Sequence, residues 1–316
     1  MSATHWFTQV LEVVVALAAA PLFLGWVNQC RAWLQNRRAP SLLLPYRALQ
    51  KLLSKDAVIA QGASPLFRGA PYIVFGAMVA MAAIVPSMGS RLPLTSAADA
   101  IVLVGLLATA RVFLALAAMD IGTAFGSLGA RREMMVGFLA EPALLMIIFV
   151  ASLISGTTAL PIISERLLTQ SVGLYPSLAF TGVAFTMVLL AENARIPVDN
   201  PVTHLELTMI HEAMLLEYSA RHLAVMERAA ARKLFNYACV GFALFLPWGV
   251  AVGEAGPGAL LVSIPVLVLK LAAAGGGLAL IETLSAKLRV FRAPEFLATA
   301  FLFAVLGLLV HLLLGA

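Results

Sequence analysis

The chain has 316 residues, of which 61% are hydrophobic and 12% charged, and its mean hydropathy is +0.96. A soluble domain carries roughly 25% charged residues, so this composition excludes an ordinary soluble protein. The net charge of +5 does not indicate nucleic-acid binding, because the basic residues lie between apolar runs and form no basic domain. The two cysteines, Cys30 and Cys239, are too few for a disulfide framework or an iron–sulfur cluster.

Apolar runs long enough to cross a membrane recur along the whole chain. A bilayer core needs about 20 mostly apolar residues per helix, and no run has the sustained alternation of a barrel strand. Met1 to Trp6 contain no lysine or arginine, so we expect the first run to be a retained span and not a signal peptide. The sequence predicts an all-α polytopic membrane protein, with one membrane domain over residues 1–316 and about eight spans. The predicted spans are 6–27, 69–88, 97–119, 134–155, 173–192, 219–249, 257–281 and 296–315.

The basic residues are distributed unequally between the two sets of loops. Seventeen of the 21 lysines and arginines fall in or beside loops that alternate along the chain, and only Arg91 and Arg166 fall on the opposite side. Loops rich in lysine and arginine remain in the cytoplasm. We therefore expect both termini to face outward.

The first long cytoplasmic loop, residues 28–68, contains leucines interleaved with Arg47, Lys51 and Lys55. This pattern predicts a short basic amphipathic helix on the membrane surface. A plain solvated linker is the alternative.

Several charged residues lie inside the spans or at their cytoplasmic edges. A charge at the bilayer centre costs at least ~2.5–3.5 kcal/mol, so such side chains normally face a bundle interior, pair, or line an ion path. Glu133 and Glu141, eight residues apart, point to roughly the same helix face. The full set of charged residues could form structural buried ion pairs or a proton relay. The set consists of Arg111 and Lys270 within spans, and of Glu133, Glu141, Glu192 and Glu282 near span ends.

The second long loop, residues 193–218, carries the most polar sequence. Pro197 and Pro201 end the fifth span, because proline removes a helix donor. Thr203 and Glu206 form a capping box that would restart a helix. On one face of that helix we expect His204, Thr208, His211, Leu215, Tyr218 and His222.

This loop is a poor candidate for a metal site. His211 and Glu212 begin an HExxH pattern, but Leu215 stands where the second histidine is needed. His204 and His211 would lie about 10 Å apart along a helix, too far to share an ion. We expect no metal site, and no nucleotide-binding or nucleophile motif indicates a self-contained enzyme.

A set of recognisable motifs is scattered over nearly the whole chain. The stretch ENARIPVD at 192–199, then Glu206 and Glu217-Tyr218-Ser219, resembles the loop pattern of the complex I subunit 1 family. Arg37-Arg38-Ala39-Pro40 is similar to its RRGP element, and Tyr46-Arg47 with Lys51 to its Y-R-x-x-x-K element. Residues similar to the branch found in energy-converting [NiFe] hydrogenases are Arg111, Asp120, Gly129, Glu133, Glu141-Pro142, Lys270 and Glu282.

The chain departs from the complex I pattern within the loop 193–218. Complex I relatives carry E-x-E-x-E in the loop, whereas this chain has Val202, His204 and Glu206, so only the last acid remains. Val198 also replaces the usual phenylalanine. These departures favour the hydrogenase branch over a quinone-binding subunit.

The resemblance implies a membrane anchor and coupling subunit in the inner (cytoplasmic) membrane. Its expected partners are hydrogenase large and small subunits, an iron–sulfur subunit and antiporter-like membrane subunits. The [NiFe] centre and iron–sulfur clusters would belong to those partners, and this chain would hold no cofactor. The implied docking residues are Arg37, Arg38, Tyr46, Arg47, Arg195, Asp199 and Tyr218.

Redox turnover in the docked subunits would perturb the loop 193–218 and move protons or sodium ions. The expected relay residues are Arg111, Glu133, Glu141, Glu192, Glu206, Glu212, Glu217, Lys270 and Glu282. Two alternatives stay open at this point. One is a quinone-site heel subunit of respiratory complex I, and the other is a stand-alone ion transporter, which inverted repeats would favour.

Overall fold

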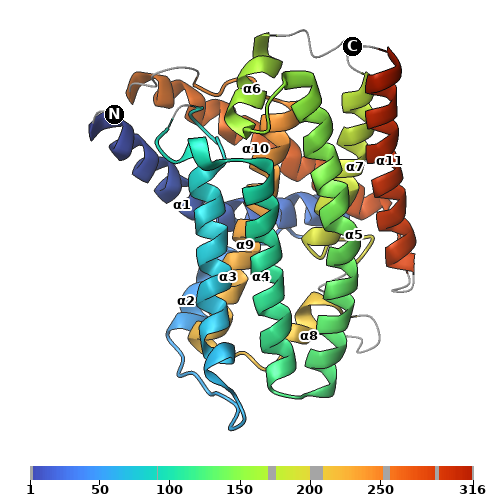
Figure 1. The fold of residues 1–316 in the computed structure, drawn as a ribbon. Helices are drawn as coiled ribbons and strands as arrows, with labels where there is room; N and C mark the ends of the chain where they lie inside the picture. Colours follow the sequence, from blue (N-terminus) through green and yellow to red (C-terminus); the bar gives the residue numbers. More distant parts are fainter. Residues whose placement is uncertain are drawn as a thin grey trace.

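The computed structural model describes residues 3–90, 92–169, 176–199, 209–251, 257–288 and 292–314, and these are helices joined by loops without a β-strand (Figure 1). The predicted all-α fold is confirmed. The helices are α1 (Ala3–Leu34), α2 (Leu44–Leu53), α3 (Pro65–Ile84), η1 (Thr95–Ala97), α4 (Ala100–Asp120), α5 (Ala124–Ser155), α6 (Leu160–Thr169), α7 (Pro176–Glu192), α8 (His211–Leu215), α9 (Ala220–Phe245), α10 (Pro257–Leu284) and α11 (Ala293–Leu314).

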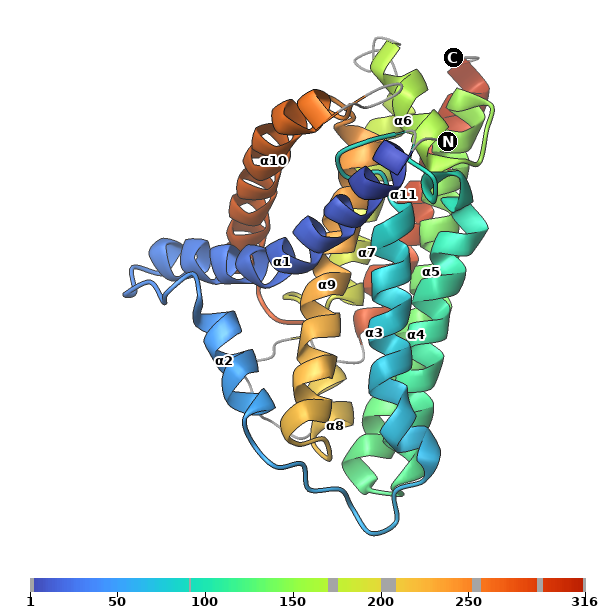
Figure 2. The same ribbon diagram turned by 90° about the vertical axis from the view of Figure 1, so that its left-hand side faces the viewer.

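Six helices in the described part of the chain are long and apolar enough to cross a membrane. Helix α7 is apolar but shorter, and α9 carries charged residues through its first half. The chain is thus a multi-pass membrane protein, while the count of eight spans and the outward orientation stay predictions. Both termini lie at the same end of the bundle (Figure 2). The six spans are His5–Leu34, Pro65–Ile84, Ala100–Asp120, Ala124–Ser155, Val262–Leu284 and Ala293–Leu314.

The helices form a bundle with α9 near its centre. Helices α3, α4 and α5 lie side by side, and α11 packs against α5 and α7 (Figures 1 and 2). Helix α1 packs against α10 and α9, and it crosses the bundle at a steep angle in Figure 2. Because α9 touches α1, α3 and α7, its polar side chains can reach several neighbouring helices.

Local sequence signals explain the ends of α4 and α5. The side chain of Asp99 accepts a hydrogen bond from the backbone N of Ile101 at 3.0 Å and so caps α4. Thr123 accepts one from the backbone N of Gly126 at 3.3 Å and caps α5. Helix α5 therefore begins about ten residues before the predicted fourth span. It consequently carries both Glu133 and Glu141.

Helix α2 confirms the short helix predicted in the loop 28–68. It starts with Pro45 in its first turn, where proline fits a helix, and it buries Leu49. Its position relative to a membrane surface stays a prediction.

The predicted helix running from Thr203 to His222 is wrong for the part that the structure describes. Residues 200–208, including Glu206 and His204, lie outside the described ranges. The chain leaves helix α8 after Leu215, and α9 begins at Ala220, so His211, Tyr218 and His222 share no helix face.

Tertiary contacts cause this break. The Tyr218 ring stacks on Phe67 with centroids 4.1 Å apart, and its hydroxyl donates to the Phe67 carbonyl at 3.0 Å. The hydroxyl of Ser219 donates to the carbonyl of Val58 and accepts from its N–H. These contacts with residues far away in sequence outweigh local helix propensity.

Candidate functional site

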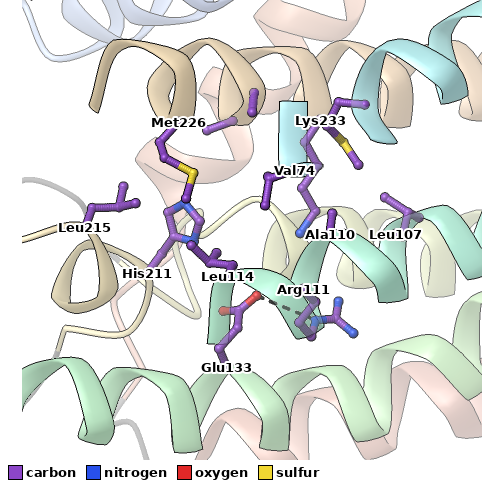
Figure 3. A pocket seen from close by; sticks show the side chains of 13 residues that line it. Val74, Leu107, Ala110, Arg111, Leu114, Glu133, His211, Leu215, Met226 and Lys233 are labelled. Atoms are coloured by element: carbon purple, nitrogen blue, oxygen red, sulfur yellow. Dashed lines mark ion pairs between the residues drawn. The ribbon is translucent and has the colours of Figure 1, made fainter. Parts of the chain in front are cut away.

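Arg111 is the centre of a buried ionic group inside the bundle. It lies on α4, is 3% exposed, and forms direct hydrogen-bonded ion pairs with Glu141 of α5 and Glu192 of α7. Its Nε lies 3.6 Å from the Oε1 of Glu133, as the dashed line in Figure 3 marks. The structure thus brings together four of the predicted relay residues from three helices.

Helix geometry explains how α5 supplies two carboxylates to one arginine. Glu133 and Glu141 are about two helical turns apart and face the same side. Gly137 lies midway between them, and a Cβ there would stand 2.6 Å from the Cδ of Arg111. Because Gly137 has no side chain, the arginine can lie across the surface of α5 between the two acids.

Lys233 of α9 completes this group, and its place was not foreseen from the sequence. Its Nζ lies 2.8 Å from the Oε2 of Glu192, so Glu192 bridges two cations. The sequence pattern placed Lys233 among the loop charges, whereas the structure turns it inward. Burying so many charges is tolerable only when each has a partner. We call Arg111, Glu133, Glu141, Glu192 and Lys233 the inner ionic group.

A second, smaller group lies where α1, α10 and the segment after α7 meet. Glu282 is 3% exposed, and its two oxygens lie 3.2 Å from Arg195 and 3.6 Å from Arg31. This ion pair joins a predicted relay residue, Glu282, to a predicted docking residue, Arg195. We call Arg31, Arg195 and Glu282 the outer ionic group.

Two cavities adjoin these groups. The inner cavity is mostly apolar, but Arg111, Glu133 and Lys233 contribute to its wall (Figure 3). The outer cleft is more polar, and Arg31, Arg195, Asp199, Glu212 and Glu227 contribute to its wall. Residues of α8 contribute to both walls, so the two spaces are neighbours.

The other predicted relay residues lie apart from the inner ionic group. Lys270 donates to the carbonyl of Leu246 at 2.5 Å and lies over the Phe242 ring, with no carboxylate beside it in the described part of the chain. Glu212 lies at the outer cleft. Glu217 forms no ion pair with any described residue, including Arg221.

The predicted docking residues divide into two sets. Arg37, Arg38 and Arg47 are exposed and free to meet a partner subunit. The other four make internal contacts, and a docking role stays a prediction for all seven. The Tyr46 hydroxyl bonds the Ala18 carbonyl, the Asp199 carboxylate accepts from the backbone N of His211 at 3.3 Å, Tyr218 packs on Phe67, and Arg195 pairs with Glu282.

Glu12 is a further buried acid that the sequence reading did not single out. It lies on α1, is 1% exposed, and its Oε1 accepts from the N of Ser87 at 2.8 Å, from the Oγ of Ser87 at 2.6 Å and from the N of Met88 at 2.8 Å. The sequence feature that could have identified Glu12 is its place as a single acidic residue inside an apolar predicted span. Among the described residues, no group of three or more histidine, cysteine, aspartate or glutamate side chains is arranged to hold a metal ion.

Comparison with known families agrees with this architecture. A family model described as NADH dehydrogenase matches residues 8–313. The chain belongs to the NADH dehydrogenase family. The resemblance to complex I subunit 1 is therefore confirmed.

Two curated relatives in the family come from Escherichia coli (strain K12). Formate hydrogenlyase subunit 4 is 33% identical over 301 residues, covering 94% of this chain and 95% of the relative. Hydrogenase-4 component C is 34% identical over 260 residues, covering 82% of this chain and 81% of the relative. Both are subunits of hydrogenase systems, as the hydrogenase-branch motifs predicted.

A solved structure shares the fold. A chain in the structure of the membrane-bound sulfane sulfur reductase, an archaeal respiratory membrane complex, superposes with a TM-score of 0.82 at 19% identity. The match covers 96% of this chain and 98% of that chain. At this level of identity the likeness shows the fold alone.

Proposed function

We propose that this chain is the membrane anchor and coupling subunit of an energy-converting [NiFe] hydrogenase complex of the formate hydrogenlyase type, in the inner (cytoplasmic) membrane. The chain matches 95% and 81% of the length of two hydrogenase-system relatives. The observation that carries the coupling role is the inner ionic group, where Arg111 meets three carboxylates. Redox chemistry belongs to partner subunits, which hold the [NiFe] centre and the clusters.

The charge of the inner ionic group suits it to hold and release a proton. Its three carboxylates outnumber its two cations, so one additional proton would make the group neutral. A carboxylate that loses a nearby cation binds a proton more readily. Small displacements of Arg111 or Lys233 therefore change how strongly the group holds that proton.

The segment after α7 supplies the displacement in this proposal. Glu192 is the last residue of α7, so the inner ionic group is tied directly to the segment that begins at residue 193. Asp199 in that segment bonds the first residue of α8, which packs against α4 and α5. A partner subunit that moves this segment would thereby move charges within the bundle.

In this proposal, partner subunits dock on exposed basic residues. Arg37, Arg38 and Arg47 cluster in the loop that includes α2, and they would meet acidic surfaces of hydrogenase large and small subunits. An iron–sulfur subunit and antiporter-like membrane subunits would complete the complex.

The composition of the complex can be tested by tagging the chain, purifying it in mild detergent and identifying the proteins that copurify. Hydrogenase large and small subunits are expected, and formate dehydrogenase would make the complex a formate hydrogenlyase. Flavin-containing NADH dehydrogenase subunits would instead make the chain a complex I heel. Recovery of a stable chain alone would contradict the proposal and favour a transporter.

Coupling can be tested with Glu141→Gln, which removes one carboxylate of the inner ionic group. In inverted membrane vesicles, the variant complex should assemble and evolve hydrogen but build little pH gradient or sodium gradient per hydrogen formed. The matched control is Glu295→Gln, because Glu295 is an exposed carboxylate on α11 without an ion pair to any described residue. Full wild-type coupling in Glu141→Gln would overturn the coupling role.

A further inference from the structure

His211 occupies the boundary between the outer cleft and the inner cavity. Three residues contribute to the walls of both spaces, namely His211, Leu215 and Ala230. Of these, His211 alone has a side chain that can carry a proton. Figure 3 shows its ring on one side of the inner cavity, with Arg111 and Lys233 on the other and Glu133 between them.

The position of His211 is fixed from two directions. Its backbone N donates to the Asp199 Oδ2 at 3.3 Å, which ties it to the segment after α7. On the other side, α8 packs closely on α5, where a Cβ at Gly129 would lie 2.9 Å from the carbonyl oxygen of Ile210. The guanidinium of Arg132 donates to the carbonyl of Met209 at 2.8 Å. The histidine therefore has a defined place and is not a loosely held loop residue.

Charged groups face His211 from several of the elements around it. Its ring feels the electrostatic influence of four residues: Glu133 on α5, Glu192 on α7, Asp199 in the segment after α7, and Lys233 on α9. Arg111 shares the inner cavity, and the outer cleft adds Arg31, Arg195, Glu212 and Glu227.

The surroundings of His211 favour the neutral form of its ring. Desolvation lowers the pKa of His211 below its ordinary value and outweighs the opposing attraction of Glu133. A neutral imidazole has one nitrogen that donates and one that accepts a hydrogen bond. It can accept a proton on one nitrogen and release another from the opposite nitrogen.

We propose that His211 transfers protons between the outer cleft and the inner ionic group, and so serves as the proton-transfer residue of the coupling path. The proposal rests on the proposed coupling function and names the residue through which the proton passes. A proton binds the nitrogen nearer one space, and the proton on the other nitrogen leaves to the other space, so charge and protons balance in each step. Because Asp199 holds His211, movement of residues 193–199 changes the position of His211 and so the rate of this step.

The test uses the whole complex in inverted membrane vesicles, with two variants at one position. His211→Gln keeps a polar side chain of similar size that cannot be protonated. His211→Ala leaves room for an added imidazole molecule between the two spaces. The matched control is His311→Ala on α11, which removes a histidine that lines neither cavity.

Both His211 variants should assemble with the hydrogenase subunits and lose the proton gradient per hydrogen formed by about tenfold or more. Added imidazole should restore coupling in His211→Ala and not in His211→Gln, and the restored activity should follow the protonation of the added imidazole as pH changes. The control should couple like the wild type. If His211 had a purely structural role, coupling would not follow the protonation state of the added imidazole as the pH changes.

Each other outcome overturns the proposal. Wild-type coupling in His211→Gln would show that no proton needs this side chain. Lost coupling in His211→Ala without rescue by imidazole, or failure of both variants to retain hydrogenase subunits, would assign His211 a structural role. If Glu141→Gln is uncoupled while His211→Gln is not, the coupling function stands and only this inference fails. If Glu141→Gln couples normally, the coupling function itself fails.

Discussion

The inner and outer ionic groups are built from the same kinds of side chain, yet their charge balance is opposite. The inner group has more carboxylates than cations, whereas the outer group has Arg31 and Arg195 around one carboxylate, Glu282. An excess of carboxylates leaves room for a proton, and an excess of arginines does not, because arginine stays protonated in proteins. We therefore interpret the inner group as the part that changes protonation and the outer group as a tie between α1, α10 and the segment after α7.

The largest effect is expected from Arg111→Ala, which would leave the buried carboxylates of Glu133 and Glu192 and the half-buried one of Glu141 with Lys233 as the one remaining cation of the group. Breaking a buried ionic group by removing one partner costs about 3–5 kcal/mol. The thermal unfolding temperature of the purified complex should fall sharply. Arg111→Lys is the control, because it keeps the charge and should retain more of the stability. An unchanged unfolding temperature in Arg111→Ala would break the interpretation of a tightly coupled group.

A smaller loss of stability is expected from Glu282→Gln. This change removes the carboxylate with which Arg31 and Arg195 form ion pairs among the described residues. We expect a cost of about 2 kcal/mol, because Arg31 is partly exposed to water. The double variant Arg195→Gln with Glu282→Gln should recover part of the loss, since it removes one unpaired cation. Thermal unfolding of both complexes provides the measurement. A loss as large as that of Arg111→Ala would erase the distinction between the two groups.

Gly137→Ala should disturb the inner group without changing any charge. The added Cβ would collide with Arg111, which must then move away from α5 at a cost of about 1–3 kcal/mol. We expect an assembled complex that builds a smaller proton gradient per hydrogen formed. Gly276→Ala is the matched control, because a Cβ at that helical position meets no atom within 4 Å. Equal coupling in both variants would show that the exact position of Arg111 is unimportant.

The smallest expected effect is a change in how stability depends on pH. The pKa of His211 is lowered in the folded protein, so the unfolded chain binds this proton more readily as the pH falls through about 6.5. Stability contributed by His211 is therefore present above that pH and is lost as the pH drops towards the folded value. The measurement is the unfolding temperature between about pH 7.5 and pH 5.5, one unit on either side of the ordinary histidine pKa. This temperature should fall less steeply with decreasing pH in His211→Gln than in the wild type. Parallel curves would show that His211 stays equally protonated in both states.

The sequence predicted the helices better than the contacts between them. Long apolar runs with few charges gave the membrane class, and the leucine and lysine pattern near Leu49 gave helix α2. The spacing of Glu133 and Glu141 placed both on one face of a helix, because helical geometry depends only on separation along the chain. Motifs of the complex I subunit 1 family indicated the family that the comparison confirmed.

Only the tertiary structure decided which charges meet. Arg111 pairs with Glu141 and Glu192, which are 30 and 81 residues away, and Arg195 pairs with Glu282, which is 87 residues away. Lys270 has the same apparent position in its span as Arg111, yet it meets a carbonyl and an aromatic ring.

The tertiary structure also decided where the chain breaks between α8 and α9 and where His211 lies. A local pattern predicted one continuous helix, but contacts of Tyr218 and Ser219 with residues far away in sequence interrupt it. Local sequence determines which backbone conformations are low in free energy. The packing of segments that are distant in sequence determines which of these conformations is adopted and which charged side chains become neighbours.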